Sequence, residues 1–160
     1  MNREKGIVDR AGTAEIDALV QMRLGYLEED HGMLDPGDAQ TIRENLPDYF
    51  RRHLDKDLTA YVIREDQEIV ACAFLLVVEK PMSPAFINGK TGTVLSVFTR
   101  PEFRRKGYAR RIMEALLADA KEMELSVVEL KATEDGYALY RAVGFQDDQS
   151  GYRLMKWKNR

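Results

Sequence analysis

The sequence predicts an α/β fold in which a central mixed β-sheet is flanked by helices. Two observations lead to this prediction. A four-residue turn separates the apolar runs 59–64 and 69–78, which is the spacing of an antiparallel hairpin. A helical pattern separates the later runs 95–99 and 126–132, and strands joined through a helix lie parallel. A sheet that holds both arrangements is mixed.

The 160 residues are expected to form one domain, residues 1–160, that is long enough to bury a core. Apolar residues make up 44% of the chain and charged residues 32%, which is typical of a globular protein. A net charge of −3 disfavours nucleic acid as a partner. The apolar run 69–78 is too short to cross a bilayer. We therefore expect a soluble cytoplasmic protein with no nucleic-acid or membrane partner.

The first part of the chain is predicted to hold one strand and two helices. The strand covers 7–11, and Thr13 is expected to cap a helix over 16–29. After a loop with the sequence Asp-Pro-Gly-Asp, a second helix begins near Asp38. Pro47 is expected to break or kink that helix, because proline has no backbone N–H to donate.

Five further elements are expected after the hairpin, and two glycines mark boundaries among them. An irregular loop is expected to end at Gly92. Gly144 is expected at the left-handed C′ position that ends the last helix. The elements are a strand over 93–99, a helix over 107–123, a strand over 126–132, a helix over 135–143 and a closing strand over 152–157.

Cys72 is the only cysteine, so no intrachain disulfide can form and a cysteine-ligated metal site lacks its ligands. It lies within the apolar run 69–78, where a small buried thiol is the ordinary interpretation. Nucleophilic chemistry would require a histidine partner, which its surroundings do not supply. We expect Cys72 to be structural.

A basic glycine turn joins the strand 93–99 to the following helix. Residues 104–109 are Arg-Arg-Lys-Gly-Tyr-Ala, so the helix begins among cations, although its dipole favours anions there. An anionic ligand would resolve this conflict, because the amides of the first turn would point at it and the Lys and Arg side chains would surround it. Gly107 would let the backbone approach closely and tolerate a positive φ. Phosphate is the natural ligand, and a solvated basic turn is the alternative.

The chain lacks the glycine patterns of nucleoside triphosphate and dinucleotide sites. It resembles the GNAT superfamily of N-acetyltransferases, whose acyl-CoA signature is Gln/Arg-x-x-Gly-x-Gly/Ala after a strand. Arg104, Gly107 and Ala109 match that signature. The second signature, Leu-Tyr followed by three residues and Gly-Phe, is matched by residues 139–145. The resemblance is close over 93–145 and extends to the earlier residues by element order.

The resemblance implies acetyl-CoA as cosubstrate, bound where two parallel strands splay apart. The main chain of Val97, Phe98 and Thr99 would pair with the pantetheine arm, and a backbone N–H near Phe98 would stabilise the oxyanion as the amine attacks. Tyr140 matches the tyrosine that protonates the leaving thiolate, since a phenol of pKa about 10 stays protonated near neutrality; a core aromatic is the alternative. The remaining acyl-CoA contacts implied are Arg104, Arg105, Lys106, Gly107, Tyr108, Ala109, Arg110 and Thr133.

The chain departs from the family pattern at two positions. Thr133 stands where many relatives carry asparagine, and its hydroxyl can still hydrogen-bond. Glu129 lies in the strand that carries the family's proton-relaying glutamate, but it is one residue out of register counted from Tyr140. A one-residue slip reverses the face of a strand. Glu129, Glu79 and solvent are therefore the candidates for the base that receives the proton of the amine.

Two functions from different classes follow. The first is an N-acetyltransferase that uses acetyl-CoA and no metal to acetylate a primary amine of a small molecule or protein. The second is a non-catalytic acyl-CoA-binding or sensing module. The sequence leaves the acceptor and the oligomeric state open, a homodimer included. Substrate contacts, or equally a solvated acidic face, are expected in the first two helices at Tyr26, Glu28, Glu29, Asp30, Tyr49 and Phe50.

Overall fold

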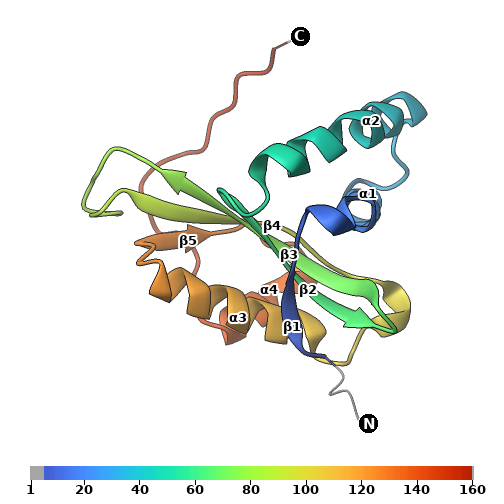
Figure 1. Cartoon of the computed structure of the whole chain (residues 1–160). Coiled ribbons are helices and arrows are strands. Elements are labelled where there is room, and N and C mark those ends of the chain that lie inside the picture. Colours follow the sequence, from blue (N-terminus) through green and yellow to red (C-terminus); the bar gives the residue numbers. More distant parts are fainter. Residues whose placement is uncertain (1–5, 160) are drawn as a thin grey trace.

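The computed structural model describes residues 6–159. Within these residues, five strands pair in their order along the chain, β1-β2-β3-β4-β5 (Figure 1). The first three pairings are antiparallel and the β4–β5 pairing is parallel, so the predicted mixed sheet is confirmed. The strands are β1 (Val8–Ala11), β2 (Leu58–Glu65), β3 (Glu68–Glu79), β4 (Lys90–Thr99) and β5 (Val127–Glu129).

Strands β2 and β3 form the predicted hairpin. Asp66 and Gln67 connect them with φ values of 50° and 69°. Positive φ at both central residues is typical of a type I′ turn, whose twist matches that of the flanking strands. Residues 69–75 of β3 are buried without interruption, because helices cover both faces of this strand. This burial explains the unbroken apolar run.

The helices divide between the two faces of the sheet (Figure 1). Helices α1 (Ile16–His31) and α2 (Pro36–His53) cover one face, where Leu19, Met22 and Phe50 are buried. Helix α3 (Tyr108–Glu122) covers the other through Ile112 and Leu116, and α4 (Glu134–Ala142) lies beside it. No helix of residues 6–159 is long and apolar enough to cross a membrane.

Helix α2 begins earlier than predicted and continues through its proline. Asp35 caps it by accepting a hydrogen bond from the backbone N–H of Asp38 (3.1 Å), and the helix begins at Pro36. Pro47 lies inside the continuous helix, so the predicted break is wrong. The carbonyl of Arg43 loses its helical partner at Pro47, but Arg43 is exposed and water can take the place of that partner.

Three other predicted boundaries are corrected by the structure. Thr13 does not cap α1; it begins a short 3-10 helix, and the N-cap residue of α1 is Glu15. Strand β4 begins at Lys90, because the segment thought to be loop pairs with the end of β3. The predicted closing strand 152–157 does not form in the described chain. A strand needs a neighbour, and no described strand pairs with this segment.

Candidate active site

The parallel strands β4 and β5 separate soon after they meet. Their pairing covers three residue pairs and ends at Thr93 with Glu129. Strand β4 continues to Thr99, so its edge over 94–99 has no described strand beside it. A cavity of about 390 Å³ opens at this edge. It is lined by Glu29, Val97, Phe98, Thr99, Phe103, Arg104, Arg105, Gly107, Tyr108, Ala109, Arg110, Thr133, Asp135, Gly136, Leu139 and Tyr140.

A β-bulge redirects β4 where it reaches the cavity. Phe74 of β3 pairs with Leu95 and Cys72 pairs with Phe98, so β4 carries one residue more than β3 between these pairs. Ser96 in the bulge is buried and has a φ of 54°, which is strained for a residue with a side chain. The Arg23 guanidinium on α1 donates a hydrogen bond of 2.6 Å to its hydroxyl. Helix α1 therefore holds the bulge in place.

The direction of the main-chain groups identifies which part of β4 faces the cavity. Arg100 N–H donates to the carbonyl of Val70 (2.9 Å), so the main-chain groups of Arg100 point toward β3. Those of Phe98, two residues earlier and paired with Cys72, point the same way. Main-chain groups alternate in direction along a strand, which directs those of Val97 and Thr99 toward the open edge. Phe98 contributes its ring to the cavity. An oxyanion donor near Phe98 is therefore an amide of one of its neighbours.

Cys72 is a buried free thiol, as the sequence predicts. Burial raises its pKa to about 12, against a smaller lowering effect of the hydrogen bond with the Phe98 backbone. A thiol with so high a pKa is protonated at neutral pH and is a poor nucleophile. Cys72 is a packing residue at the bulge.

The basic turn has the backbone geometry of an anion site. Arg105 and Gly107 have left-handed φ values of 64° and 79°. The first helical hydrogen bond of α3 runs from Arg111 N–H to the carbonyl of Gly107 (3.1 Å), so the amides of the turn before it have no helical acceptor. A Cβ built on Gly107 would meet no atom within 4 Å. Amides, helix dipole and open space together fit a phosphate group.

The side chains of the turn do not behave as predicted. We expected its cations to be uncompensated and to surround the ligand, but carboxylates from α1, β2 and α3 already neutralise several of them. Lys106 does not line the cavity, and Arg105 forms no ion pair with a described residue. The ion pairs are Arg104 with Glu29, Lys106 with Glu65 (3.2 Å) and Arg110 with Glu114 (2.9 Å).

Helix α4 is fixed at both ends and carries Tyr140 into the cavity wall. Its N-cap, Thr133, accepts a hydrogen bond from the Gly136 amide (3.2 Å) through its hydroxyl oxygen. At the C-terminus, Gly144 has the predicted positive φ of 113°, and Phe145 N–H donates to the carbonyl of Tyr140 (2.9 Å). A Cβ on Gly136 would lie 2.8 Å from the Tyr140 ring. Only glycine lets the ring lie over this turn.

The surroundings of Tyr140 keep its phenol protonated. Burial, with a smaller contribution from Tyr26, raises the pKa of its phenol to about 12. Its ring packs edge-on against that of Phe145, with 6.0 Å between the ring centres, as a core aromatic would. Its hydroxyl, however, donates no hydrogen bond to a residue within 6–159, and Tyr140 lines the cavity. The proton is therefore available to a ligand.

The two carboxylates predicted as candidate bases lie outside the cavity. Glu129 is 60% exposed on its side chain, and its carboxylate lies 3.9 Å from the Lys80 ammonium. Glu79, at the end of β3, is exposed as well. Neither lines the cavity with Tyr140. Glu129 is one residue out of register with the family pattern, and a one-residue difference places a side chain on the other face of a strand. Its position outside the cavity is consistent with that difference.

Sequence reasoning missed several residues of the cavity wall. Asp135, Gly136 and Leu139 lie on α4 within one or two turns of Tyr140, so the helical period could have found them. Phe103 follows the strand directly and precedes the basic turn. Glu29, which the sequence analysis names among the expected contacts of the first two helices, lines the cavity because α1 packs against β4.

A second cavity of about 230 Å³ lies on the opposite face of β4, under α1 and α2. Its charged wall residue is Arg23, which has no carboxylate within ion-pair distance in the described part of the chain. The Arg23 guanidinium lies 5.6 Å from the centre of the Tyr26 ring. Apolar and aromatic side chains form the rest of the lining: Leu46, Tyr49, Phe50, Leu58, Phe74 and Leu95.

Comparison with known proteins identifies the family. Residues 19–145 match the model described as the Acetyltransferase (GNAT) family. The chain belongs to the GNAT family. This confirms the predicted family, and the parallel β4–β5 pair confirms the fold predicted with it.

Relatives of this GNAT protein match it at different lengths. An uncharacterized N-acetyltransferase of Archaeoglobus fulgidus is 28% identical over 141 residues, covering 88% of this chain and 90% of that protein. An uncharacterized N-acetyltransferase, ycf52, of Porphyra purpurea is 32% identical over 70 residues, which are 44% of this chain and 40% of the relative.

Solved structures share the fold. A predicted acetyltransferase with acetyl-CoA from Clostridium acetobutylicum has a TM-score of 0.80 and 27% identity, covering 93% of this chain and 95% of that one. A GCN5-related N-acetyltransferase from Ralstonia eutropha has a TM-score of 0.78 at 20% identity, covering 93% and 97%. At 20% identity, the comparison with the Ralstonia eutropha protein shows a shared fold.

Replacing Gly107 with valine is expected to weaken CoA binding by more than about tenfold, because a Cβ would occupy the space in front of the free amides. Gly32→Val is the matched control, since Gly32 has nearly the same φ (77° against 79°) and equally open surroundings outside the cavity. Gly32→Val should lose at least as much thermal stability as Gly107→Val, because its ψ of −161°, against 14° at Gly107, lies in a region that side chains rarely adopt, yet it should leave CoA binding unchanged. Calorimetric titration with CoA measures the difference.

Neutralising Arg105 in the same titration should cost less affinity than Gly107→Val, as should neutralising the ion-paired Lys106 or Arg110. A larger loss for any of these charge variants would contradict a site built from backbone amides.

Proposed function

We propose that this GNAT protein transfers an acetyl group from acetyl-CoA to a primary amine of a small molecule or a protein. The observation that carries the proposal is the cavity at which the open β4 edge, the free amides of α3 and the unpartnered phenol of Tyr140 meet. The acetyl-CoA in the Clostridium acetobutylicum relative supports the same cosubstrate here.

The residues present fit acetyl-CoA as follows. Amides from Arg105 to Arg110 hold the pyrophosphate, with Gly107 giving them room. Main-chain groups of Val97 and the amide of Thr99 pair with the pantetheine arm as an added strand would, while the Thr99 carbonyl accepts a hydrogen bond from Arg104 Nε (3.0 Å). When bound, acetyl-CoA supplies an acetyl thioester as the acyl donor. The cavity directs that thioester toward Tyr140.

Acetyl transfer then needs one attack and three proton transfers. The amine nitrogen forms a bond to the acetyl carbon while the carbon–sulfur bond breaks, and an amide beside Phe98 stabilises the negative charge on the carbonyl oxygen. Tyr140 donates its proton to the leaving sulfur, and solvent later returns a proton to the phenolate. The candidate bases Glu129 and Glu79 do not line the cavity; of the carboxylates that do, Glu29 is paired with Arg104 and Asp135 lies in the first turn of α4. We therefore assign the proton of the amine to solvent.

We place the acceptor in the second cavity, which meets β4 on the opposite side of the bulge. Its aromatic walls suit an apolar body, and the unpaired guanidinium of Arg23 suits a carboxylate on the acceptor. Of the substrate contacts expected in the first two helices, Tyr49 and Phe50 line this cavity and the acidic residues of α1 do not. An amine with an apolar body and a carboxylate is therefore the acceptor that these walls favour.

The second candidate is a non-catalytic acyl-CoA-binding module. The described walls of the cavity hold two carboxylates, Glu29, which pairs with Arg104, and Asp135 at the start of α4. Neither candidate base predicted from the sequence is among them, and this favours the binding module. The free phenol of Tyr140 favours catalysis. Turnover distinguishes the two.

Acetyl-CoA should raise the thermal stability of the protein, and thiol should be released when amines are added, faster for apolar amines with a carboxylate than for analogues without one. Tyr140→Phe should lower kcat by roughly 10²- to 10⁴-fold while leaving the acetyl-CoA affinity unchanged, since the hydroxyl donates no hydrogen bond within the described protein. Thermal shift, thiol release and calorimetry measure these effects.

Stabilisation without thiol release from any amine would support the binding module. No stabilisation by any CoA species would contradict both functions.

The pH dependence of kcat/KM should follow the pKa of the acceptor amine and not that of a base on the protein. Below the pKa of the acceptor amine, kcat/KM should rise about tenfold per pH unit, because only the free amine attacks. Burial raises the pKa of Tyr140 to about 12, so its phenol stays protonated and causes no falling limb up to about pH 10. The rate of two acceptors with different amine pKa values should be followed against pH. A rising limb at one pH for both amines would instead indicate a base on the protein.

A further inference from the structure

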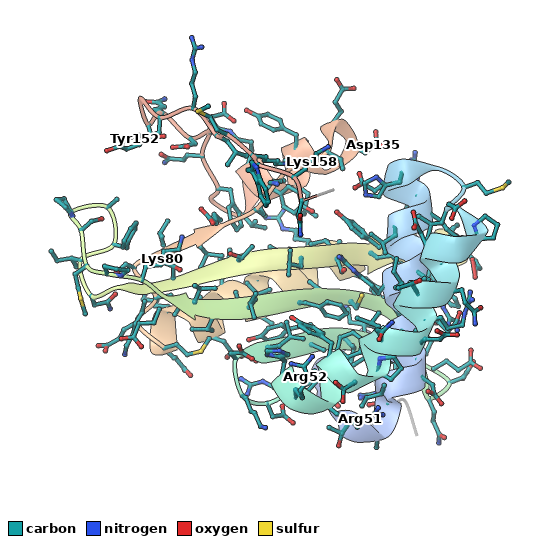
Figure 2. The ribbon with its side chains drawn as sticks, turned by 90° about the horizontal axis from the view of Figure 1, so that it is seen from above. Arg51, Arg52, Lys80, Asp135, Tyr152 and Lys158 are labelled. Atoms are coloured by element: carbon teal, nitrogen blue, oxygen red, sulfur yellow. The ribbon has the colours of Figure 1, made fainter. Side chains whose placement is uncertain are left out.

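Three consecutive residues of β4 connect the two cavities. Leu95 lines the second cavity, and Val97 lines the cavity that Tyr140 lines. Ser96 lies between them in the bulge, is buried and has the strained φ of 54°. Figure 2 shows α1 crossing the strands at the end of the sheet opposite Lys80, which is the end where β4 carries the bulge. Helix α1 therefore packs over the segment that separates the two cavities.

Two side chains hold Ser96 in its strained conformation. The Arg23 guanidinium donates to the Ser96 hydroxyl (2.6 Å), and the Cys72 thiol donates to the Ser96 carbonyl (3.4 Å). A strained residue persists only where its surroundings fix it, so the loss of either contact should let the bulge relax. One of the two contacts thus comes from Arg23, which is a wall residue of the second cavity.

The carbonyl of Ser96 determines the direction of the next amide. Within a trans peptide, the C=O and N–H groups point in opposite directions. Because the Ser96 carbonyl points to Cys72 on β3, the Val97 N–H points away from β3, toward the open edge of β4. Val97 N–H is thus the amide beside Phe98 that is placed to stabilise the carbonyl oxygen of the thioester. The orientation of this donor depends on the conformation of Ser96.

Arg23 has hydrogen-bond donors to spare on the side of the second cavity. A guanidinium carries several N–H donors, and among residues 6–159 the Ser96 hydroxyl is the only acceptor of an Arg23 hydrogen bond. The Arg23 side chain is partly buried, and no carboxylate of the described chain lies within ion-pair distance of it. A cation withdrawn from water without a partner is costly, and a carboxylate in the second cavity would offset that cost.

We propose that Arg23 and Ser96 are positioning residues, through which a carboxylate in the second cavity holds the Val97 amide in place beside the thioester. An empty cavity leaves the Arg23 guanidinium with the Ser96 hydroxyl and the Tyr26 ring, whose centre lies 5.6 Å away. A bound carboxylate takes the remaining donors in a bidentate pair, fixes the guanidinium and so fixes the bulge. Acceptors with a carboxylate are then acetylated with a higher kcat as well as a lower KM. This inference rests on the proposed function and its acceptor site.

A cycle of two acceptors and two proteins tests the coupling. The acceptors are phenylalanine and phenylalaninamide, which share an amine and an apolar body but differ in the carboxylate. The ratio of their kcat values should be at least about fivefold higher in the wild-type protein than in Ser96→Ala, which is the ordinary size of coupling between two sites. The ratio of their KM values should be the same in both proteins, because Arg23 remains. Comparing ratios cancels the difference between the two amines, and thiol release measures both constants.

Two further variants separate the hydrogen bond from the backbone strain. Ser96→Gly removes the hydroxyl but suits a positive φ, so it should fold and should lower the kcat ratio as Ser96→Ala does. Thr91→Val is the matched control, since Thr91 is also buried in β4 and its hydroxyl donates to the Val78 carbonyl (2.7 Å), away from the bulge. It should keep the wild-type ratio. A Ser96→Ala protein that loses kcat equally for both acceptors would show that the hydroxyl only supports the fold, and would overturn the proposal.

A measurement without acetyl-CoA keeps the coupling separate from the activity. Phenylacetate carries the carboxylate and an apolar body without an amine, and phenylacetamide replaces the carboxylate with a neutral amide of similar shape. Phenylacetate should shift the Val97 amide signal of isotopically labelled wild-type protein. This shift should fall by more than half with phenylacetamide, and by a similar factor when phenylacetate is added to Ser96→Ala.

The outcomes distinguish this inference from the proposed function. Shifts at Leu46 and Leu58 of the second cavity, with none at Val97, would overturn the coupling and leave the acceptor site in place. No shift with phenylacetate up to tens of millimolar would overturn the coupling too, because no carboxylate would then reach Arg23. A shift at Val97 together with no acetyl transfer to any amine would support the coupling and contradict the proposed reaction.

Discussion

The structure depends on the early separation of β4 from β5. Three residue pairs hold the two strands together, and beyond them this edge of β4 has no described strand beside it; its described partner is Arg104 Nε, which donates to the Thr99 carbonyl (3.0 Å). An unsatisfied strand edge inside a protein is costly unless a ligand or water occupies it. Here the edge faces a cavity, with the free amides of α3 at one end and Tyr140 in its wall. One gap in the hydrogen bonding of a sheet thus provides the place for an extended ligand.

The electrostatics of the basic turn show how the protein tolerates cations at a helix N-terminus. Glu29 and Glu65 are brought to the turn by α1 and β2, and Glu114 lies one turn along α3. Their charges offset the unfavourable interaction of the Arg and Lys side chains with the helix dipole in the absence of a ligand. The backbone amides remain free. We therefore expect the binding of a phosphate to depend more on the shape of the backbone than on the number of cations nearby.

Sequence patterns predicted the parts of the molecule that depend on neighbours along the chain. The strand, glycine turn and helix around Gly107 follow from local pattern, as does the C-terminus of α4 at Gly144. Long-range packing decided the rest. The pair of Arg104 with Glu29 spans 75 residues, and no local signal announces it. Glu129 has a suitable side chain in the predicted strand but lies outside the cavity. The segment 152–157 has the composition of a strand, but a strand also needs a neighbour, and no described strand pairs with this segment.

Amide chemical shifts of isotopically labelled protein during titration with CoA test the central claim most directly, because they report on backbone groups one by one. The account predicts the largest shifts at the free amides of the turn around Gly107 and at Val97 and Thr99 on the open edge. The amide signal of Phe98, which pairs with Cys72 of β3, should shift less. Shifts confined to the side-chain guanidinium groups, or centred on the outer edge of β5, would contradict a ligand site built from the open edge of β4.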